Sequence, residues 1–178
     1  KKQNYKIQWQ YNYIYDQSLD TVKQFEYGYY KSSYNGCGWI AIYNAMLYFG
    51  LKVHPAGIIE GLERYDGLIG NGLFGTNPKA IRRYFFECPY TSIRDIDYRG
   101  LDYVPVILEK KDKYKKAFIV WQKNDSGGGF HFYTVVYKLG SYYAYNSSGI
   151  QIKKRLMDII NSSGSFIKGY LIWYYKKL

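Results

Sequence analysis

Cys37 stands where a polar, glycine-containing segment gives way to a long apolar run. The run 39–49 is apolar on nearly every face and ends at Gly50, which predicts a buried helix of about three turns beginning at Cys37. A helix N-terminus and a nearby imidazolium both favour the thiolate, the nucleophilic form of cysteine. Gly36 and Gly38 let a substrate carbonyl approach the local backbone N–H groups. Cys37 is therefore a candidate nucleophile, with a buried structural cysteine as the alternative.

The base that such a nucleophile needs must be one of two histidines, His54 and His131. His54 lies beyond the end of the predicted helix, about 16 Å along its axis from Cys37 at 1.5 Å per residue. We interpret His54 as a turn or helix-terminal residue before Pro55. His131 opens a predicted strand after a Ser-Gly-Gly-Gly segment, which is typical of the edge of a site. His131 is the candidate base.

A third candidate, Asn146, lies on the strand that follows the strand of His131. If Tyr137 pairs with Tyr142 across the connecting turn, His131 pairs with Ser148, and Asn146 becomes its diagonal neighbour on the same face. An asparagine acceptor there would orient the imidazole and fix its tautomer, as the third member of a Cys-His-Asn site does. The register thus predicts that the three candidates converge.

The first part of the chain is expected to be mostly helical. Residues 5–15 alternate between aromatic or aliphatic and polar residues, which predicts one strand with a buried face. Three helical patterns follow: the central helix, a helix from Pro55 to about Tyr65, and a helix that ends near Glu87. The last has Asn77 as its N-cap and proline at its first helical position.

The second part of the chain is expected to be a sheet. Short segments rich in β-branched and aromatic residues, separated by turn residues, predict an antiparallel arrangement. The predicted strands are 104–108, 117–121, 130–137, 142–146 and 166–175, with one short helix at 154–160. Helices followed by strands predict an α+β fold with an N-terminal helical half, including the buried Cys-bearing helix, and a C-terminal antiparallel sheet half.

Length and composition limit the class of protein. The 178 residues predict a single domain, 1–178. Two cysteines, Cys37 and Cys88, exclude a disulfide framework, and with two histidines they make structural zinc unexpected, so we expect neither metal nor cofactor. No apolar stretch approaches the 18 to 20 or so residues of a membrane-spanning helix. The net charge of +11 favours contact with anionic surfaces.

A glycine motif at 70–75 matches G-x-G-x-x-G and precedes a predicted helix. The dinucleotide-binding motif requires a strand directly before the glycines, within a parallel β-α-β unit. Here the preceding residues are predicted to be helical. We therefore interpret the glycines as a loop beside the cleft and expect no nucleotide.

The ordered motifs resemble those of the papain-like cysteine peptidases, closest to the bacterial branch that contains the double-glycine leader peptidases. The resemblance lies in Asn35-Gly36-Cys37-Gly38-x-x-Ala41 at the helix start, and in His131-Phe132-x-x-Val135 with Asn146 further on. The segment 75–78 and its following helix are similar to a loop and helix that such proteins often carry between these motifs. The resemblance implies Cys37 as nucleophile, His131 as base and Asn146 as orienting residue across a cleft.

The sequence departs from that family at the oxyanion donor. These enzymes usually supply a Gln six residues before the nucleophile, where this chain has Lys31, and Gln24 lies thirteen residues before it. Tyr30, Tyr34 and Asn35 are, with Lys31, the nearby polar groups. Loss of one donor costs about 10² to 10³ in rate. We therefore expect a site that acylates but turns over slowly.

We expect an enzyme that attacks a peptide or protein amide through a thioester. Two alternatives stay open: a deamidase or transglutaminase-type effector on the same fold, and a basic, Tyr-rich binding module without turnover. The expected partner is a peptide or protein substrate, whereas nucleic acid is not an expected partner. A secreted or cell-surface bacterial protein is favoured, with a cytoplasmic location left open.

Overall fold

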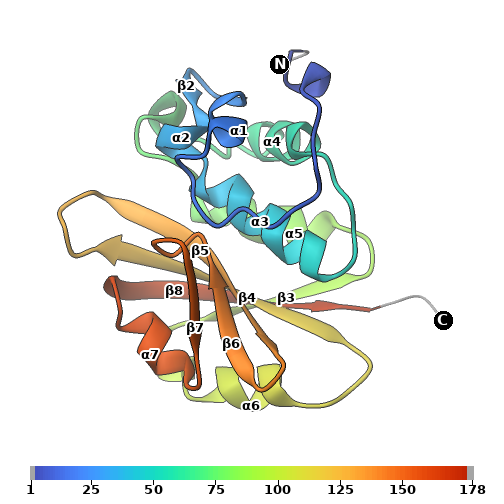
Figure 1. Ribbon diagram of the computed structural model, residues 1–178, viewed down its shortest axis with the longest axis vertical. Coiled ribbons are helices and arrows are strands. Elements are labelled where there is room, and N and C mark those ends of the chain that lie inside the picture. The colour runs from blue at the N-terminus through green and yellow to red at the C-terminus, as the bar shows by residue number, and fades with distance from the viewer. Residues whose placement is uncertain (1–2, 176–178) are drawn as a thin grey trace.

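The computed structural model describes residues 3–175 and combines helices with a six-stranded antiparallel sheet, an α+β architecture. The helical half lies on one side of the sheet (Figure 1). Its elements are η1 (Asn4–Lys6), α1 (Asp20–Lys23), β1 (Glu26–Tyr27), β2 (Tyr30–Lys31), α2 (Ser32–Asn35), α3 (Cys37–Tyr48), α4 (Pro55–Arg64), η2 (Gly70–Gly72) and α5 (Pro78–Glu87). The predicted central helix and the two helices that begin at Pro55 and Pro78 are confirmed.

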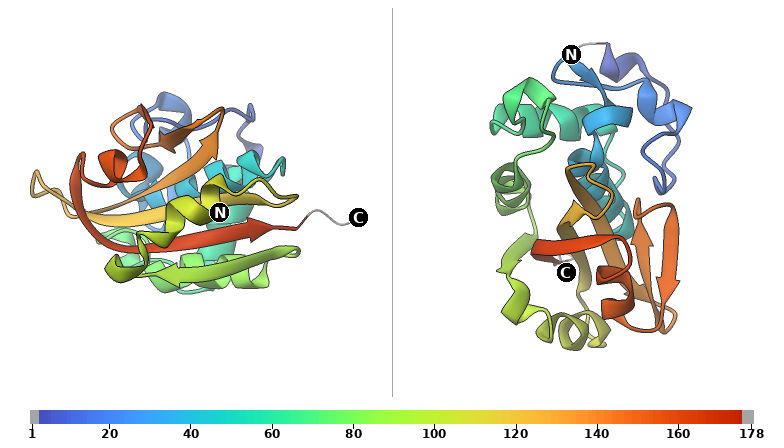
Figure 2. Two further views of the ribbon diagram at one scale, coloured as in Figure 1. Left: turned by 90° about the horizontal axis from the view of Figure 1, so that it is seen from below. Right: turned by 90° about the vertical axis from the view of Figure 1, so that its left-hand side faces the viewer.

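The sheet has the strand order β3-β8-β4-β5-β6-β7, and every neighbouring pair is antiparallel. Its strands are β3 (Thr91–Ile96), β4 (Lys115–Asn124), β5 (Phe130–Lys138), β6 (Ser141–Tyr145), β7 (Ile150–Lys153) and β8 (Gly164–Tyr174). Three short helices, η3 (Tyr98–Gly100), α6 (Tyr103–Glu109) and α7 (Leu156–Ile160), complete the fold. Figure 2 shows α6 and α7 on the side of the sheet away from α3.

Two apolar clusters cover the two faces of the sheet. Along β4, Ala117 and Ile119 pack with the helical half, whereas Phe118 and Val120 pack with residues of α6 and α7. This is the alternation that a strand buried on both faces requires. The helix α3 is buried along almost its whole length, so it is fixed between the sheet and the other helices.

The predicted N-terminal strand is wrong. Apart from η1, residues 5–15 are irregular, and Tyr5, Tyr11 and Tyr15 are exposed rather than forming one buried face. We refer to residues 7–19, which cross the helical half, as the N-terminal strap. The strap is held at Ile14, whose N–H donates to Asn44 Oδ1 (2.9 Å) and whose carbonyl accepts from Asn44 Nδ2 (2.8 Å). One buried amide side chain on α3 thus replaces the strand partner that the pattern predicted.

The predicted strand at 104–108 is also wrong, because these residues belong to α6. Val104 and Leu108, one helical turn apart, are both buried against the sheet. Pro105 lies in the first turn of the helix, where its missing N–H costs no hydrogen bond. The i, i+4 burial of two side chains therefore outweighs the β-branched composition of the segment.

The glycine motif forms a loop between α4 and α5, as expected, but none of its residues lines the cleft described below; the loop approaches α2 at Gly72, and the following Thr76 approaches the start of α3. A Cβ atom added at Gly38 would lie 2.2 Å from Thr76 Oγ1, and one added at Gly72 would lie 2.6 Å from Asn35 Nδ2. Only glycine allows this close approach. Within residues 3–175, no helix has the length and apolar character needed to cross a bilayer.

Candidate active site

Cys37 is the first residue of α3, and Gly36 joins this helix to the short α2. At this position the backbone N–H has no partner within α3. The Cys37 side chain is only 7% exposed, and its small accessible part opens into a cleft. The sequence-based placement of Cys37 at the start of a buried helix is confirmed.

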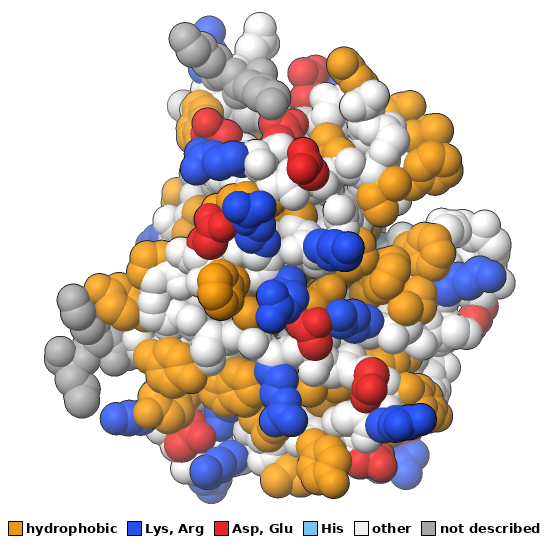
Figure 3. All heavy atoms as spheres, turned by 180° about the vertical axis from the view of Figure 1, so that it is seen from behind, with side chains coloured by type: hydrophobic (Ala, Val, Ile, Leu, Met, Phe, Trp, Pro, Cys, Tyr) orange, Lys and Arg blue, Asp and Glu red, His pale blue; other side chains and the backbone are white. Residues whose placement is uncertain are grey.

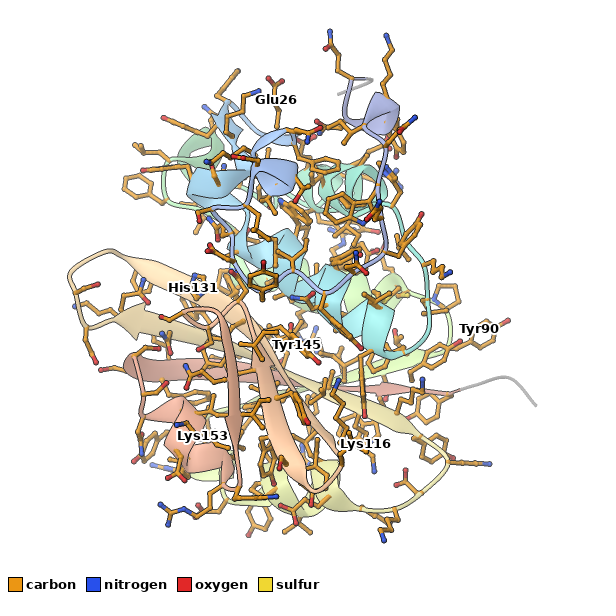
Figure 4. The ribbon with its side chains drawn as sticks, in the orientation of Figure 1. Glu26, Tyr90, Lys116, His131, Tyr145 and Lys153 are labelled. Carbon is orange, nitrogen blue, oxygen red and sulfur yellow. The ribbon has the colours of Figure 1, made fainter. Side chains whose placement is uncertain are left out.

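His131 lies on β5, at the boundary between the sheet and the helical half (Figure 4). Its Nε2 atom is 2.6 Å from the backbone carbonyl oxygen of Asn146. A carbonyl only accepts hydrogen bonds, so Nε2 carries the proton of the neutral ring and Nδ1 keeps its lone pair. In this tautomer Nδ1 is the ring atom that is able to accept a proton.

The Cys37 and His131 side chains interact, and this interaction raises the pKa of His131. Burial lowers the pKa of His131, but the neighbouring Cys37 and the Asn146 carbonyl raise it and together outweigh burial. The net pKa of His131 is above its ordinary value of 6.5. Cys37, the residue from which a base would take a proton, thus stabilises the protonated form of His131.

A second contact fixes α3 against β5. Thr134 Oγ1 donates a hydrogen bond of 2.7 Å to the carbonyl of Ala41, and Thr134 is fully buried. Ala41 lies one turn after Cys37, and Thr134 lies three residues after His131. This contact fixes the position of the helix against the strand that carries His131.

The predicted hairpin register is confirmed, because Tyr137 pairs with Tyr142. The predicted pairing of His131 with Ser148 does not form, since the ladder ends at Thr134 and Tyr145 and both Asn146 and Ser148 have positive φ. Asn146 approaches His131 through its main-chain carbonyl. The expectation that the side-chain amide of Asn146 orients the imidazole is thus replaced by a backbone contact.

The side chain of Asn146 is buried beside this contact. Asn146 is 4% exposed, and its Nδ2 atom has no hydrogen-bond partner within residues 3–175. Its φ of 65° lies in the left-handed region, which asparagine and glycine tolerate better than other residues. Asn146 is therefore suited to the turn that aims the carbonyl at His131.

A cleft of about 710 Å³ opens above Cys37 and His131. Its walls come from the N-terminal strap and α2 on one side, and from the β4–β5 turn, the β6–β7 turn and the α7–β8 turn on the other. Polar side chains predominate, among them Gln17, Ser33, Gln122 and Asn146. The three predicted site residues all line this one cleft.

Gln17 is a site residue that the sequence interpretation missed. It belongs to the N-terminal strap and lines the cleft together with Cys37. Its Nε2 donates to the Ser33 carbonyl (3.0 Å), which leaves a second N–H on the same atom. The two hydrogen bonds between the Ile14 backbone and the Asn44 side chain fix the strap three residues before Gln17. A glutamine before Cys37 was the feature to look for, but Gln17 lies twenty residues before Cys37 instead of six.

Most of the expected replacement donors are engaged elsewhere. Lys31 forms an exposed ion pair with Glu26 (2.9 Å), and Asn35 Nδ2 donates to the Tyr27 carbonyl (2.8 Å). Tyr30 stacks on Tyr34, with ring centroids 5.1 Å apart, and does not line the cleft. Tyr34 does line the cleft, although its hydroxyl donates to the Leu73 carbonyl (3.3 Å).

The other titratable candidates do not join the site. His54 caps α4, because its Nδ1 accepts from the Ala56 N–H (3.2 Å) while Nε2 donates to the Ile7 carbonyl (3.1 Å). Burial raises the pKa of Cys88 above its ordinary value, against a smaller opposing effect from Thr91. Residues 3–175 contain no group of three or more His, Cys, Asp and Glu side chains that could hold a metal ion.

Comparison of the sequence with protein-family models gives no match, and comparison with curated proteins gives no significant one.

Proposed function

We propose that this protein is a papain-like cysteine hydrolase that cleaves a peptide or protein amide through a thioester on Cys37. The observation that carries the proposal is the position of His131, which interacts with Cys37 while its Nε2 bonds to the Asn146 carbonyl. A helix-start cysteine, a correctly oriented imidazole and a shared cleft are the parts that such a nucleophile requires.

In the proposed reaction, His131 Nδ1 takes the thiol proton and Cys37 Sγ bonds to the substrate carbonyl carbon. The tetrahedral intermediate then collapses, the carbon–nitrogen bond breaks, and His131 returns the proton to the departing amine. A water molecule, deprotonated by His131, then attacks the thioester carbon. The carbon–sulfur bond breaks, and His131 returns the proton to Cys37 Sγ. The products are a carboxylic acid and the free Cys37 thiol.

We further propose that Gln17 Nε2 and the backbone N–H of Cys37 stabilise the oxyanion. Both residues line the cleft, and Gln17 has an N–H that its bond to Ser33 does not use. Two donors are the usual complement for a tetrahedral oxyanion. With Gln17 in this role, the slow turnover expected from Lys31 no longer follows.

Alkylation with iodoacetamide at pH 6, followed by peptide mass spectrometry, tests the proposal. An ordinary thiol with a pKa near 8.5 is almost wholly protonated at this pH. We expect Cys37 to react at least about tenfold faster than Cys88, since only the thiolate is strongly nucleophilic. In the His131→Ala variant this advantage should disappear.

Cys88 is the internal control, because it is accessible in part and lacks an imidazole partner among the described residues. Equal alkylation of the two cysteines in the folded wild-type protein contradicts the proposed function. Circular dichroism of both proteins establishes that the fold is retained.

A further inference from the structure

The charge of the cleft is opposite to that of the whole protein. Lys and Arg account for 25 of the 178 residues, and Figure 3 shows many of them on the face opposite to that of Figure 1. Among the described residues, none of them lines the cleft, which instead contains the carboxylates of Asp16 and Asp125. At contact distance these carboxylates dominate, because salt screens more distant charges beyond about 8 to 10 Å.

The two carboxylates come from opposite halves of the molecule. Asp16 belongs to the N-terminal strap, and Asp125 follows β4 in the β4–β5 turn. Asp16 Oδ1 accepts a hydrogen bond from the Ser18 N–H (2.8 Å), which lowers the pKa of Asp16 and keeps it ionised at neutral pH. Neither carboxylate forms an ion pair with any residue in the range 3–175.

A buried acceptor without a donor lies in the same cleft. Gln122 is 2% exposed, and its Nε2 donates to Asn124 Oδ1 (3.3 Å) and Ser163 Oγ (3.2 Å). These two bonds fix the amide orientation, and Oε1 has no partner within the described part of the chain. A buried acceptor of this kind is stabilised by a donor from a ligand.

Two aromatic rings border the cleft from its two sides. Tyr34 is 59% exposed and Phe130 is 53% exposed, and each is supported from behind, by Tyr30 and Trp121 respectively. An exposed aromatic face attracts a Lys ammonium or an Arg guanidinium. The rings also offer apolar surface to the aliphatic part of such a side chain.

We infer that the cleft selects a substrate with a Lys or Arg side chain close to the scissile amide. Asp16 and Asp125 supply the opposite charge, Gln122 Oε1 supplies an acceptor, and the aromatic rings flank the cation. This inference depends on the proposed function, because it names the substrate class of the same site. Asp16 and Asp125 are specificity-determining residues in this scheme.

The test uses peptidyl acyloxymethyl ketones based on acetyl-Ala-Ala-Ala, in which one alanine at a time is replaced by Lys, norleucine or Glu. Attack by Cys37 Sγ forms a carbon–sulfur bond and expels the carboxylate leaving group. At one of the three positions at least, we expect the Lys probe to react about five to ten times faster than the norleucine probe, and the Glu probe to react slowest. In 0.5 M NaCl the difference should shrink.

Asp16→Asn and Asp125→Asn should each reduce the preference for Lys over norleucine. Asp20→Asn is the matched control, since it removes one charge from the same region but lies outside the cleft. Equal rates for Lys and Glu probes at all three positions, with Cys37 still selectively alkylated by iodoacetamide, overturn the inference and leave the proposed function intact. Absence of selective alkylation overturns both.

Discussion

Replacement of Asn146 by glycine separates the role of its main chain from that of its side chain. The carbonyl that bonds to His131 Nε2 is kept, and glycine adopts a φ of 65° without strain. We therefore expect the rate of Cys37 labelling by a peptidyl electrophile to stay within about threefold of wild type. A side chain that fixes the tautomer would be far more important, since its loss in a related triad costs about 10⁴ in rate.

The stability of the same variant can be estimated from the burial of Asn146. Its Nδ2 is buried without a partner in residues 3–175, and removing such a donor recovers about 1 to 3 kcal/mol. Glycine loses about 0.5 to 1 kcal/mol through chain entropy. We expect thermal unfolding to shift upward by a few degrees, at about 2 to 4 °C per kcal/mol.

Asn146→Ala is the matched comparison, because alanine also keeps the carbonyl but pays about 1 to 2 kcal/mol for the left-handed backbone. Labelling kinetics and differential scanning calorimetry on the three proteins give both quantities. A loss of labelling greater than a hundredfold in folded Asn146→Gly refutes the main-chain role and restores the side chain as the orienting group.

Three further predictions concern the oxyanion donor, the base and the loop. Gln17→Ala should lower turnover of a cleaved peptide by about 10² to 10³ with little loss of stability. Gln24→Ala is the control, because Gln24 lies outside the cleft, and it should leave turnover unchanged. Comparable losses of turnover in both variants would exclude Gln17 as the oxyanion donor. Because Cys37 and the Asn146 carbonyl raise the pKa of His131 above its unfolded value of about 6.5, these interactions stabilise the fold fully below about pH 6.5 and are lost as pH rises through the folded pKa. Denaturant titrations between pH 5.5 and 8 should show that decline, and Cys37→Ala should reverse it, because burial, the largest effect on the pKa of His131, then outweighs the smaller opposing effect of the Asn146 carbonyl. Gly38→Ala should destabilise the protein by about 1 to 3 kcal/mol, because the added Cβ atom would lie 2.2 to 2.5 Å from three side-chain atoms of Thr76, its Cβ included. Thr76→Gly, which removes all three atoms, should partly rescue the variant in a double-mutant cycle.

The hairpin and helix signals in the sequence were sufficient to place Cys37 and His131. A Gly-Cys-Gly segment before an apolar run predicts the start of α3, and the turn between Tyr137 and Tyr142 predicts the register of β5 and β6. Both signals are local, and tertiary packing agrees with them. Where Asn146 leaves the ladder, however, backbone conformation decides which of its atoms meets His131, and side-chain pairing rules do not describe that turn.

Other parts of the fold depend on long-range partners that periodicity does not reveal. The alternation of residues 5–15 resembles a strand, but the sheet ends at β3 and β7 and a side chain of α3 takes the partner's place. The strand β3 went unpredicted because its residues are mostly half-buried or exposed and do not alternate. Gln17 was missed because its place in the cleft depends on the path of the strap, which is set by contacts with residues distant in the sequence.

The attachment of the strap to α3 gives the site a second level of stability. The Asn44 side chain forms two hydrogen bonds with the Ile14 backbone, and Trp9 Nε1 donates to the Tyr43 hydroxyl (3.0 Å). Residues 7–19 form no β-ladder with another strand. A subglobal opening of these contacts would release Gln17 from the cleft while Cys37 and His131 stay on the buried core. Hydrogen exchange at the Ile14 amide would then report the same opening free energy as the loss of turnover in mild denaturant. The proposed activity would then be lost through one cooperative opening well before the fold is lost, with Cys37 still in place.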